Sequence, residues 1–179
     1  GRWQYGGSGQ PVTSLADSAT TGRAGLTYVF DSGFAPYVSY AESFSPEMGT
    51  DAATGAPFKP STGAQYEIGV KYQPEGFNGF FSVSAFHLTR QNVRSPHVTD
   101  EDPWGETQTG EARVRGIEIE GKAEVLPGLD VIASYSYNRS EVTKSTAREQ
   151  IGRPLHGTPK HLASLWASYA FQEGSPLHG

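Results

Sequence analysis

Four charged residues occupy alternate positions in one stretch of the sequence: Glu118, Glu120, Lys122 and Glu124. Carboxylates on one face of a strand recur about 6.6 to 7 Å apart, a separation at which one can act as an acid and the other as a base. Nothing else in the sequence supports acid–base catalysis. Because a hydrated wall also needs charged residues at this spacing, we interpret the row as a surface that faces water.

Metal binding and nucleophilic catalysis lack the residues that they need. The chain has no cysteine, and His156 and His161 lie five residues apart across a Thr-Pro break, with no acidic residue at metal-ligand spacing. No Gly-x-Ser-x-Gly motif is present, and the glycine-rich segment 6–9 is not followed by Gly-Lys-Ser/Thr. We therefore predict no catalytic residue, no metal site and no resident cofactor, and we expect that the protein is not an enzyme.

Composition narrows the class of protein further. The 14 Lys and Arg residues against 19 Asp and Glu leave a net charge of -5, which disfavours binding to the phosphates of nucleic acid. With 22 Gly and 12 Pro residues the chain favours strands and turns. No stretch approaches the roughly 18 apolar residues of a membrane-spanning helix, whereas a spanning β-barrel needs only alternate apolar residues.

The hydrophobic pattern repeats every two residues, and no window shows a helical stripe. In residues 63–73, for example, Tyr66 and Ile68 face one way, while Glu67 and Lys71 face the other. Seven strands are predicted, at 22–31, 34–44, 63–73, 80–92, 107–125, 129–142 and 159–171, together with a partial strand in residues 1–5. In 80–92 the alternation is blurred, so the pattern does not assign an apolar face to that strand.

The connections differ strongly in length. Short turns at 32–33, 75–79 and 126–128 alternate with long polar loops at 6–20, 45–62, 93–106 and 143–158. All the long loops must therefore lie at one end of the strands, as in outer-membrane barrels, and soluble sandwiches rarely separate loop lengths so completely. We predict an all-β fold, an antiparallel up-and-down transmembrane β-barrel.

The two faces of the predicted strands suit lipid on one side and a wet lumen on the other. Seven tyrosines recur near strand ends, as expected of an aromatic girdle at the lipid headgroups. They are Tyr28, Tyr40, Tyr66, Tyr72, Tyr135, Tyr137 and Tyr169. A general preference of tyrosine for strands explains part of this pattern as well.

Four segments together resemble the C-terminal half of the barrel in TonB-dependent siderophore receptors. They are TGRAGLTYVFDSGFAPYVSYAESFSP (21–46), GAQYEIGVKYQP (63–74), TGEARVRGIEIEGKAEVLPGLDVIASYSY (109–137) and RPLHGTPKHLASLWASYAF (153–171). Within that family the pattern is most similar to the ferrichrome-type receptors. The resemblance implies that residues 1–179 are about one third of a 22-stranded barrel, with the plug domain and the terminal strands absent.

The same resemblance implies a function and its partners. The segment is expected to belong to a receptor in the bacterial outer membrane that takes up a ferric siderophore, of hydroxamate type, so that iron enters as cargo. The expected partners are the siderophore, outer-membrane lipid and, through the plug, the inner-membrane TonB energy-coupling complex. Five loop residues are candidates for ligand contact, because aromatic rings offer rigid contact area and arginine suits anionic or carbonyl-rich chelates: Phe58, His97, Trp104, Arg148 and Arg153.

Two other classes of protein remain open at this stage. A passive porin or a small structural barrel of the outer membrane would show the same alternation without energy coupling. A secreted β-sandwich module would cover its apolar face with a second sheet and would be soluble without detergent.

Overall fold

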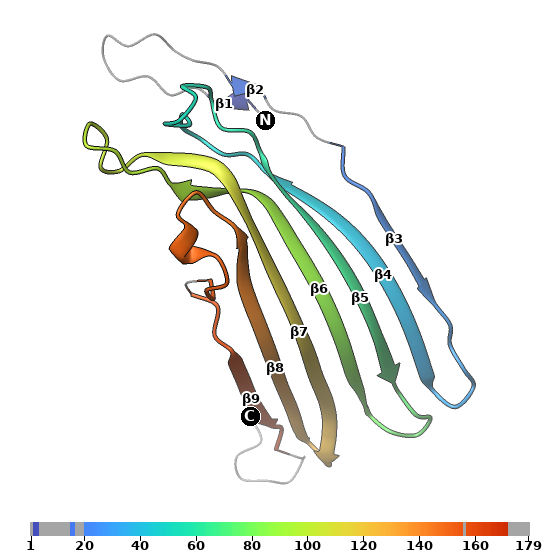
Figure 1. Cartoon of the computed structure of the whole chain (residues 1–179). Coiled ribbons are helices and arrows are strands. Elements are labelled where there is room, and N and C mark those ends of the chain that lie inside the picture. Colours follow the sequence, from blue (N-terminus) through green and yellow to red (C-terminus); the bar gives the residue numbers. More distant parts are fainter. Residues whose placement is uncertain (1, 4–14, 17–19, 156, 172–179) are drawn as a thin grey trace.

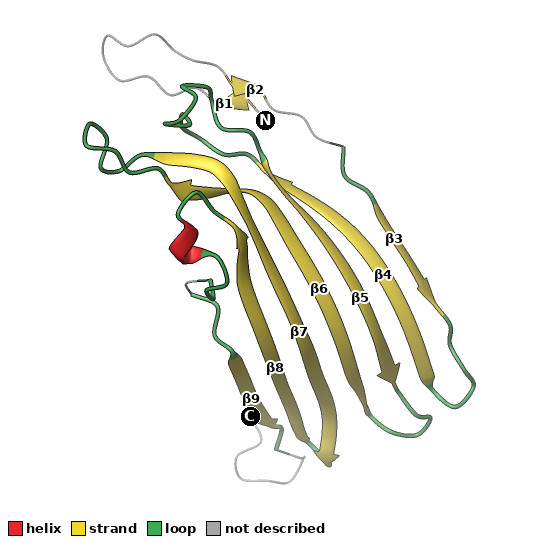
Figure 2. Ribbon diagram, viewed as in Figure 1, coloured by secondary structure: helices red, strands yellow, loops and turns green. Residues whose placement is uncertain are grey.

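A computed structural model describes residues 2–3, 15–16, 20–155 and 157–171 of the chain. Strands β1 (Arg2–Trp3) and β2 (Leu15–Ala16) form a small antiparallel pair. The remaining strands form one antiparallel sheet of seven strands in chain order, drawn as a single curved layer in Figure 1. The sheet is not closed on itself, and Figure 2 shows one short helical turn beside it.

The strands of the sheet are long and joined to their neighbours along the chain. Their bounds are β3 (Arg23–Thr27), β4 (Phe34–Ser45), β5 (Ser61–Tyr72), β6 (Gly79–Pro96), β7 (Glu106–Leu126), β8 (Leu129–Lys144) and β9 (His161–Tyr169). The 3-10 turn η1 covers Arg148–Gln150. These strands confirm the seven predicted from the alternation. Within the described residues, no helix is long and apolar enough to cross a membrane.

The register places most of the large apolar residues of the sheet on one face, although Ile132, Leu162 and Trp166 of β8 and β9 lie on the other. One row across the sheet runs through Leu26, Val38, Ile68, Ala85, Ile117, Tyr137 and His161, each directly opposite the next. Large side chains on this face are exposed, with Leu26 at 72%, Ile68 at 60% and Leu165 at 75%. No second layer of described residues covers these side chains. The face is therefore apolar and open, as contact with lipid requires, and the alternative of a β-sandwich is excluded.

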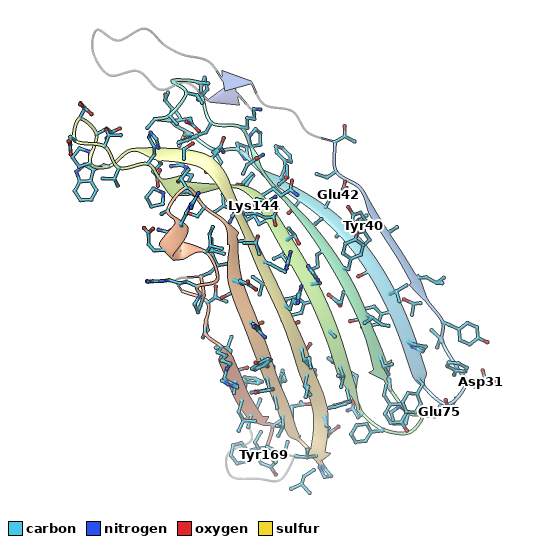
Figure 3. The ribbon with its side chains drawn as sticks, viewed as in Figure 1. Asp31, Tyr40, Glu42, Glu75, Lys144 and Tyr169 are labelled. Atoms are coloured by element: carbon cyan, nitrogen blue, oxygen red, sulfur yellow. The ribbon has the colours of Figure 1, made fainter. Side chains whose placement is uncertain are left out.

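Tyrosines border this apolar face at both ends. Tyr40 and Tyr66 lie side by side on neighbouring strands toward the long loops, with their rings tilted and the ring centroids 4.8 Å apart. Tyr169 lies at the opposite end, beside the short turns, as Figure 3 shows. Along β8, the nine residues from Leu129 to Tyr137 match the roughly 9–11 residues that a tilted strand needs to cross a bilayer. The positions agree with the predicted girdle.

The opposite face carries polar side chains and two close contacts of rings with glycines. Tyr37 donates a hydrogen bond to Glu67 Oε1 (2.6 Å), and its ring lies directly over Gly69. On β6 and β7, the ring of Phe86 lies over Gly116 in the same manner. Phe86 therefore places an aromatic ring on the polar face of β6, which explains why the alternation in residues 80–92 is blurred. The register shows that Val83 and Ala85 lie on the apolar face of that strand.

The short turns close the end of the sheet opposite the long loops. In the turn between β7 and β8, Gly128 has a φ of 82°, a conformation that side chains with a Cβ rarely adopt. Glu124 accepts hydrogen bonds from Gly128 N (2.8 Å) and from Asn78 Nδ2 (2.6 Å), so it joins this turn to the preceding one. Of the four residues in the predicted charged row, Glu124 thus lies near the end of β7 and fixes the adjacent turns.

Two of the long loops, those expected at 45–62 and 93–106, are shorter than the sequence pattern predicts. β6 continues to Pro96 and β7 begins at Glu106, so the loop expected at 93–106 is reduced to 97–105. Register shifts around Asn92, which has a φ of 56°, allow the ladder to continue through a bulge that breaks the period of two. The loop expected at 6–20 contains β2, and most of its residues lie outside the described part of the chain.

The glycine contacts on the polar face give a direct test. A Cβ at Gly69 would lie 2.6 Å from the ring of Tyr37, so Gly69→Ala must displace that ring and its hydrogen bond to Glu67. We expect the free energy of unfolding in urea to fall by about 1–3 kcal/mol. The control is Gly121→Ala, whose Cβ would meet Phe81 at an ordinary 3.6 Å. Equal unfolding midpoints for the two variants would contradict the packing.

Candidate ligand-binding loops

Three described loops gather at the end of the sheet opposite the short turns. They cover residues 46–60, 97–105 and 145–160, and they connect β4 to β5, β6 to β7 and β8 to β9 (Figure 1). Because β6, β7 and β8 are 18, 21 and 16 residues long, their ends continue well past the 9–11 residues that cross a bilayer. These loops therefore stand on a rigid extension of the wall.

Asp51 fixes the shape of loop 46–60. Its Oδ2 accepts hydrogen bonds from Thr107 Oγ1 (2.7 Å) and Gln108 N (2.9 Å) at the start of β7. Its Oδ1 accepts from the backbone N–H groups of Ala53 (2.9 Å) and Thr54 (3.1 Å). The bond from Gln108 N–H, the Thr107 hydroxyl and the two loop amides together lower the pKa of the Asp51 carboxyl to about 2.

Arg94 is the second anchor of the same loop. Its guanidinium lies 3.1 Å from Glu47 Oε2 and 3.1 Å from Glu106 Oε2, and it donates to the carbonyl of Met48 (2.6 Å). The same group lies over the ring of Phe58, 4.7 Å from its centroid. Arg94 thus joins loop 46–60 to the ends of β6 and β7 through several partners at once.

The other two loops are attached to this assembly by fewer bonds. Loop 97–105 is closed by a bond from His97 N to the Gly105 carbonyl (2.7 Å), and Ala52 N donates to the Glu106 carbonyl (2.8 Å) at its base. Loop 145–160 contacts the end of β6 through Thr146 Oγ1, which donates to the Pro96 carbonyl (2.7 Å). Successive loops are therefore connected from one strand pair to the next around the rim.

The five candidate residues fall into two groups. Trp104 is 90% exposed in loop 97–105, and Arg148 and Arg153 are exposed in loop 145–160, while His97 is half-buried. Phe58 differs from the expectation, because it is only 4% exposed and lies beneath Arg94. Its ring holds the loop in place instead of offering a surface. Among the described residues, no hydrogen bond, ion pair or ring contact joins one candidate to another.

The described side chains at this rim can offer a ligand surface contact and charge. No group of three His, Asp or Glu side chains that could hold a metal ion occurs among the described residues, and His156 of the proposed histidine pair lies outside them. His161 is held by Tyr135, whose hydroxyl lies 2.9 Å from Nδ1. The carboxylates Glu118 and Glu120 lie on the polar face of β7, opposite serines of the neighbouring strands.

The two residues that organise the loops are not among the candidates predicted from the sequence. Asp51 and Arg94 bind partners that are distant along the chain, such as Gln108 and Glu47, so no local spacing reveals them. The only local signal is the pattern Asp51-x-x-Thr54-Gly55, which is typical of a turn in which the side chain caps backbone N–H groups. The pattern predicts a turn, and the long-range contacts arise only from the register of β6 and β7.

The fold and the loops define a class of protein, a segment of wall from a membrane-spanning β-barrel with its long loops on one rim. A family model described as "TonB dependent receptor-like, beta-barrel" matches residues 2–178. The chain therefore belongs to the TonB-dependent receptor β-barrel family, as the sequence motifs predicted. Proteins of this family are transporters of the bacterial outer membrane and not enzymes, which confirms the predicted location.

Individual relatives agree with the family. The chain is 41% identical over 165 residues to the ferrichrome outer membrane transporter/phage receptor of Escherichia coli. The aligned residues cover 91% of this chain and 21% of that protein. It is 36% identical over 155 residues to the ferrioxamine receptor of Yersinia enterocolitica, covering 86% of this chain and 21% of that protein. The chain thus spans about a fifth of the length of these relatives.

Solved structures show the same fold. The Pseudomonas aeruginosa ferripyoverdine receptor, bound to ferripyoverdine, superposes with a TM-score of 0.73 at 20% identity, covering 90% of this chain and 22% of that one. The ferric preacinetobactin receptor BauA of Acinetobacter baumannii superposes with a TM-score of 0.69 at 25% identity. The match covers 92% of this chain and 24% of that one. The open sheet is therefore the shape that this family's barrel wall takes over a comparable span.

The Asp51 anchor predicts a pH dependence of loop 46–60. Because the folded-state pKa of about 2 lies below the ordinary 3.8, the carboxylate stabilises the loop at every pH above about 4 and loses this effect as pH falls toward 2. The chain has no cysteine, so a fluorophore on Ala56→Cys reports the loop alone. Its anisotropy should stay constant from pH 7 to about 4 and then fall.

Two variants separate this effect from general acid denaturation. Asp51→Asn should give low anisotropy that no longer varies with pH, whereas Asp100→Asn, which removes an exposed carboxylate in loop 97–105, should keep the original profile. A profile that is flat to pH 2 in the unchanged protein would show that Asp51 does not hold the loop.

Proposed function

We propose that this chain is part of the barrel of an outer-membrane receptor that takes up a ferric siderophore. The observation that supports this most strongly is the separation of the sheet into an exposed apolar face and a polar face, with long anchored loops on one rim only. Such a wall supports transport through its lumen and binding at its mouth. No described residue is arranged for making or breaking covalent bonds.

The proposed cargo is a ferric hydroxamate. Two relatives that match most of this chain are named for ferrichrome and ferrioxamine, both of which are hydroxamate chelates. Receptors named for other siderophores also match, so the substrate class depends on the loops of this chain. Exposed Trp104, Arg148 and Arg153, together with His97 in the same loop as Trp104, would provide aromatic contact and hydrogen bonds to a chelate rich in carbonyl oxygens. Phe58 acts through the shape of its loop.

The proposal for the remaining partners rests on the short length of this chain compared with its relatives. We propose that residues 1–179 are a portion of a larger barrel, whose further strands pair with the edge strands β3 and β9. The polar face, with Glu67 and Glu118, would then face a plug domain inside the barrel. Through that plug the receptor would engage the inner-membrane TonB complex, while the apolar face contacts lipid.

An uptake experiment tests the substrate class. The intact protein that carries this segment is expressed in a receptor-deficient strain, and entry of iron-55 is followed as ferric ferrichrome, ferrioxamine B or a catecholate complex. We expect saturable uptake of a hydroxamate that stops when the membrane is de-energised. Uptake of the catecholate alone would contradict the substrate class, and entry without energy would identify a passive pore instead.

Loop variants test which residues bind the chelate. Trp104→Ala and the double change Arg148→Gln/Arg153→Gln should each weaken binding of the ferric hydroxamate to whole cells about five- to tenfold. Matched controls at the other end of the sheet are Phe77→Ala in a short turn and Lys71→Gln on the polar face, which should stay within twofold. Equal affinity for the loop variants and the controls would remove these residues from the site.

A further inference from the structure

An apolar furrow runs along the lipid-facing side of β7, next to the short turns. Small residues form its floor: Gly121 and Ala123 of β7 and Ala133 of β8, which lies directly opposite Gly121. Phe77 of the turn before β6 and Phe81 of β6 stand along one side, and both rings are exposed. The furrow has a volume of about 400 Å³, within the range of pockets that hold small ligands.

The packing of the sheet itself does not require the glycine in the floor. A Cβ at Gly121 would meet Phe81 at an ordinary 3.6 Å, and the φ of Gly121 lies outside the left-handed region. Gly69 and Gly116 differ, because a Cβ at either would lie 2.6 Å from a ring of the protein. Glycine inside a strand weakens the strand and often marks the close approach of another molecule. The floor therefore has room for an external group.

The short turns beside the furrow carry negative charge. Residues 28–33 and 73–78 connect β3 to β4 and β5 to β6, and their charged side chains are Asp31 and Glu75. Figure 3 shows both at this end of the sheet. Glu75 lies two positions before Phe77, which lines the furrow. Within the described residues, neither carboxylate makes an ion pair or a side-chain hydrogen bond, so both are available to an external cation.

The lysines near this end lie on the other face of the sheet. The register places Lys71 of β5 and Lys122 of β7 on the polar face, where Lys71 lies over the ring of Tyr37. Because short turns of bacterial barrels are periplasmic, the furrow opens to the periplasmic leaflet of the membrane. A lipid headgroup there meets carboxylates, which attract an ammonium group and repel a headgroup of net negative charge.

We propose that the furrow binds a phospholipid of the periplasmic leaflet whose headgroup carries an ammonium group, as in phosphatidylethanolamine. One acyl chain lies along Gly121 and Ala123, beside Phe77 and Phe81. The ammonium group lies at the adjacent turn, next to Glu75. This inference depends on the orientation of the sheet in the membrane and not on the identity of the ferric ligand.

The test measures lipid binding to the intact protein that carries this segment, in a nonionic detergent, by native mass spectrometry. The probes are phosphatidylethanolamine, phosphatidylglycerol with the same acyl chains, and phosphoethanolamine, which has no chains. The protein should retain phosphatidylethanolamine and bind the other two at least fivefold more weakly. Equal retention of phosphatidylglycerol would show a wall that accepts any acyl chain, and equal retention of phosphoethanolamine would show a headgroup site without the furrow; either result overturns the proposal.

Variants of the turn test the headgroup. Glu75→Gln should weaken binding of phosphatidylethanolamine about fivefold, and Glu75→Lys should reverse the preference in favour of phosphatidylglycerol. Glu101→Gln removes the same charge from loop 97–105 at the other rim and should change binding less than twofold. An unchanged preference in Glu75→Lys would refute the role of the turn.

Variants of the floor test the acyl chain. Ala133→Leu fills the furrow with a side chain and should weaken binding of phosphatidylethanolamine about tenfold. Ala85→Leu adds the same side chain to the same face outside the furrow and should change binding less than twofold. An Ala133→Leu protein that folds, as judged by its heat-modifiable migration, and still binds like the unchanged protein would refute the site. Uptake of the siderophore, measured separately, reports on the proposed function alone.

Discussion

The structure depends on the need to satisfy backbone N–H and C=O groups where no water is present. In hydrocarbon this requires every strand to be paired on both edges, and the chain achieves it for β4 to β8 through continuous antiparallel ladders. β3 and β9 are the edges of the described sheet, so each needs a further strand before the wall can stand in lipid. The same ladder makes successive side chains point alternately to lipid on one face and to water on the other. The functional features of the wall follow from this separation of its two faces.

The two faces and the rim have different tasks. The apolar face offers exposed Leu26 and Ile68 to lipid, whereas the polar face is ordered by small contacts such as that of Tyr37 with Gly69 and Glu67. On the rim, the loops are rigid because they are bonded to strand ends that extend past the membrane. A binding surface carried on such loops can therefore differ between relatives without changing the wall.

The sequence was sufficient for the parts of the fold that depend on local alternation. All seven strands, the apolar face of β5 and the three short turns follow from residues near each other in the chain. It failed where cross-strand contacts decide the outcome. The face of β6 became clear only through the register that pairs Phe86 with Gly116, and the bulge at Asn92 lengthened β6 beyond its pattern. Phe58 looked like a ligand contact because nothing nearby in sequence reveals that Arg94 covers it.

The absence of cysteine from the chain allows the central claim to be measured directly. Single cysteines at residues 117–122 of β7, placed in the intact protein in bilayers, are labelled with a nitroxide, and its relaxation by oxygen and by a water-soluble nickel chelate is compared. Oxygen should dominate at Ile117, Ile119 and Gly121, and the chelate at Glu118, Glu120 and Lys122. A profile without this period of two, or one with the opposite phase, would contradict a wall that separates lipid from water.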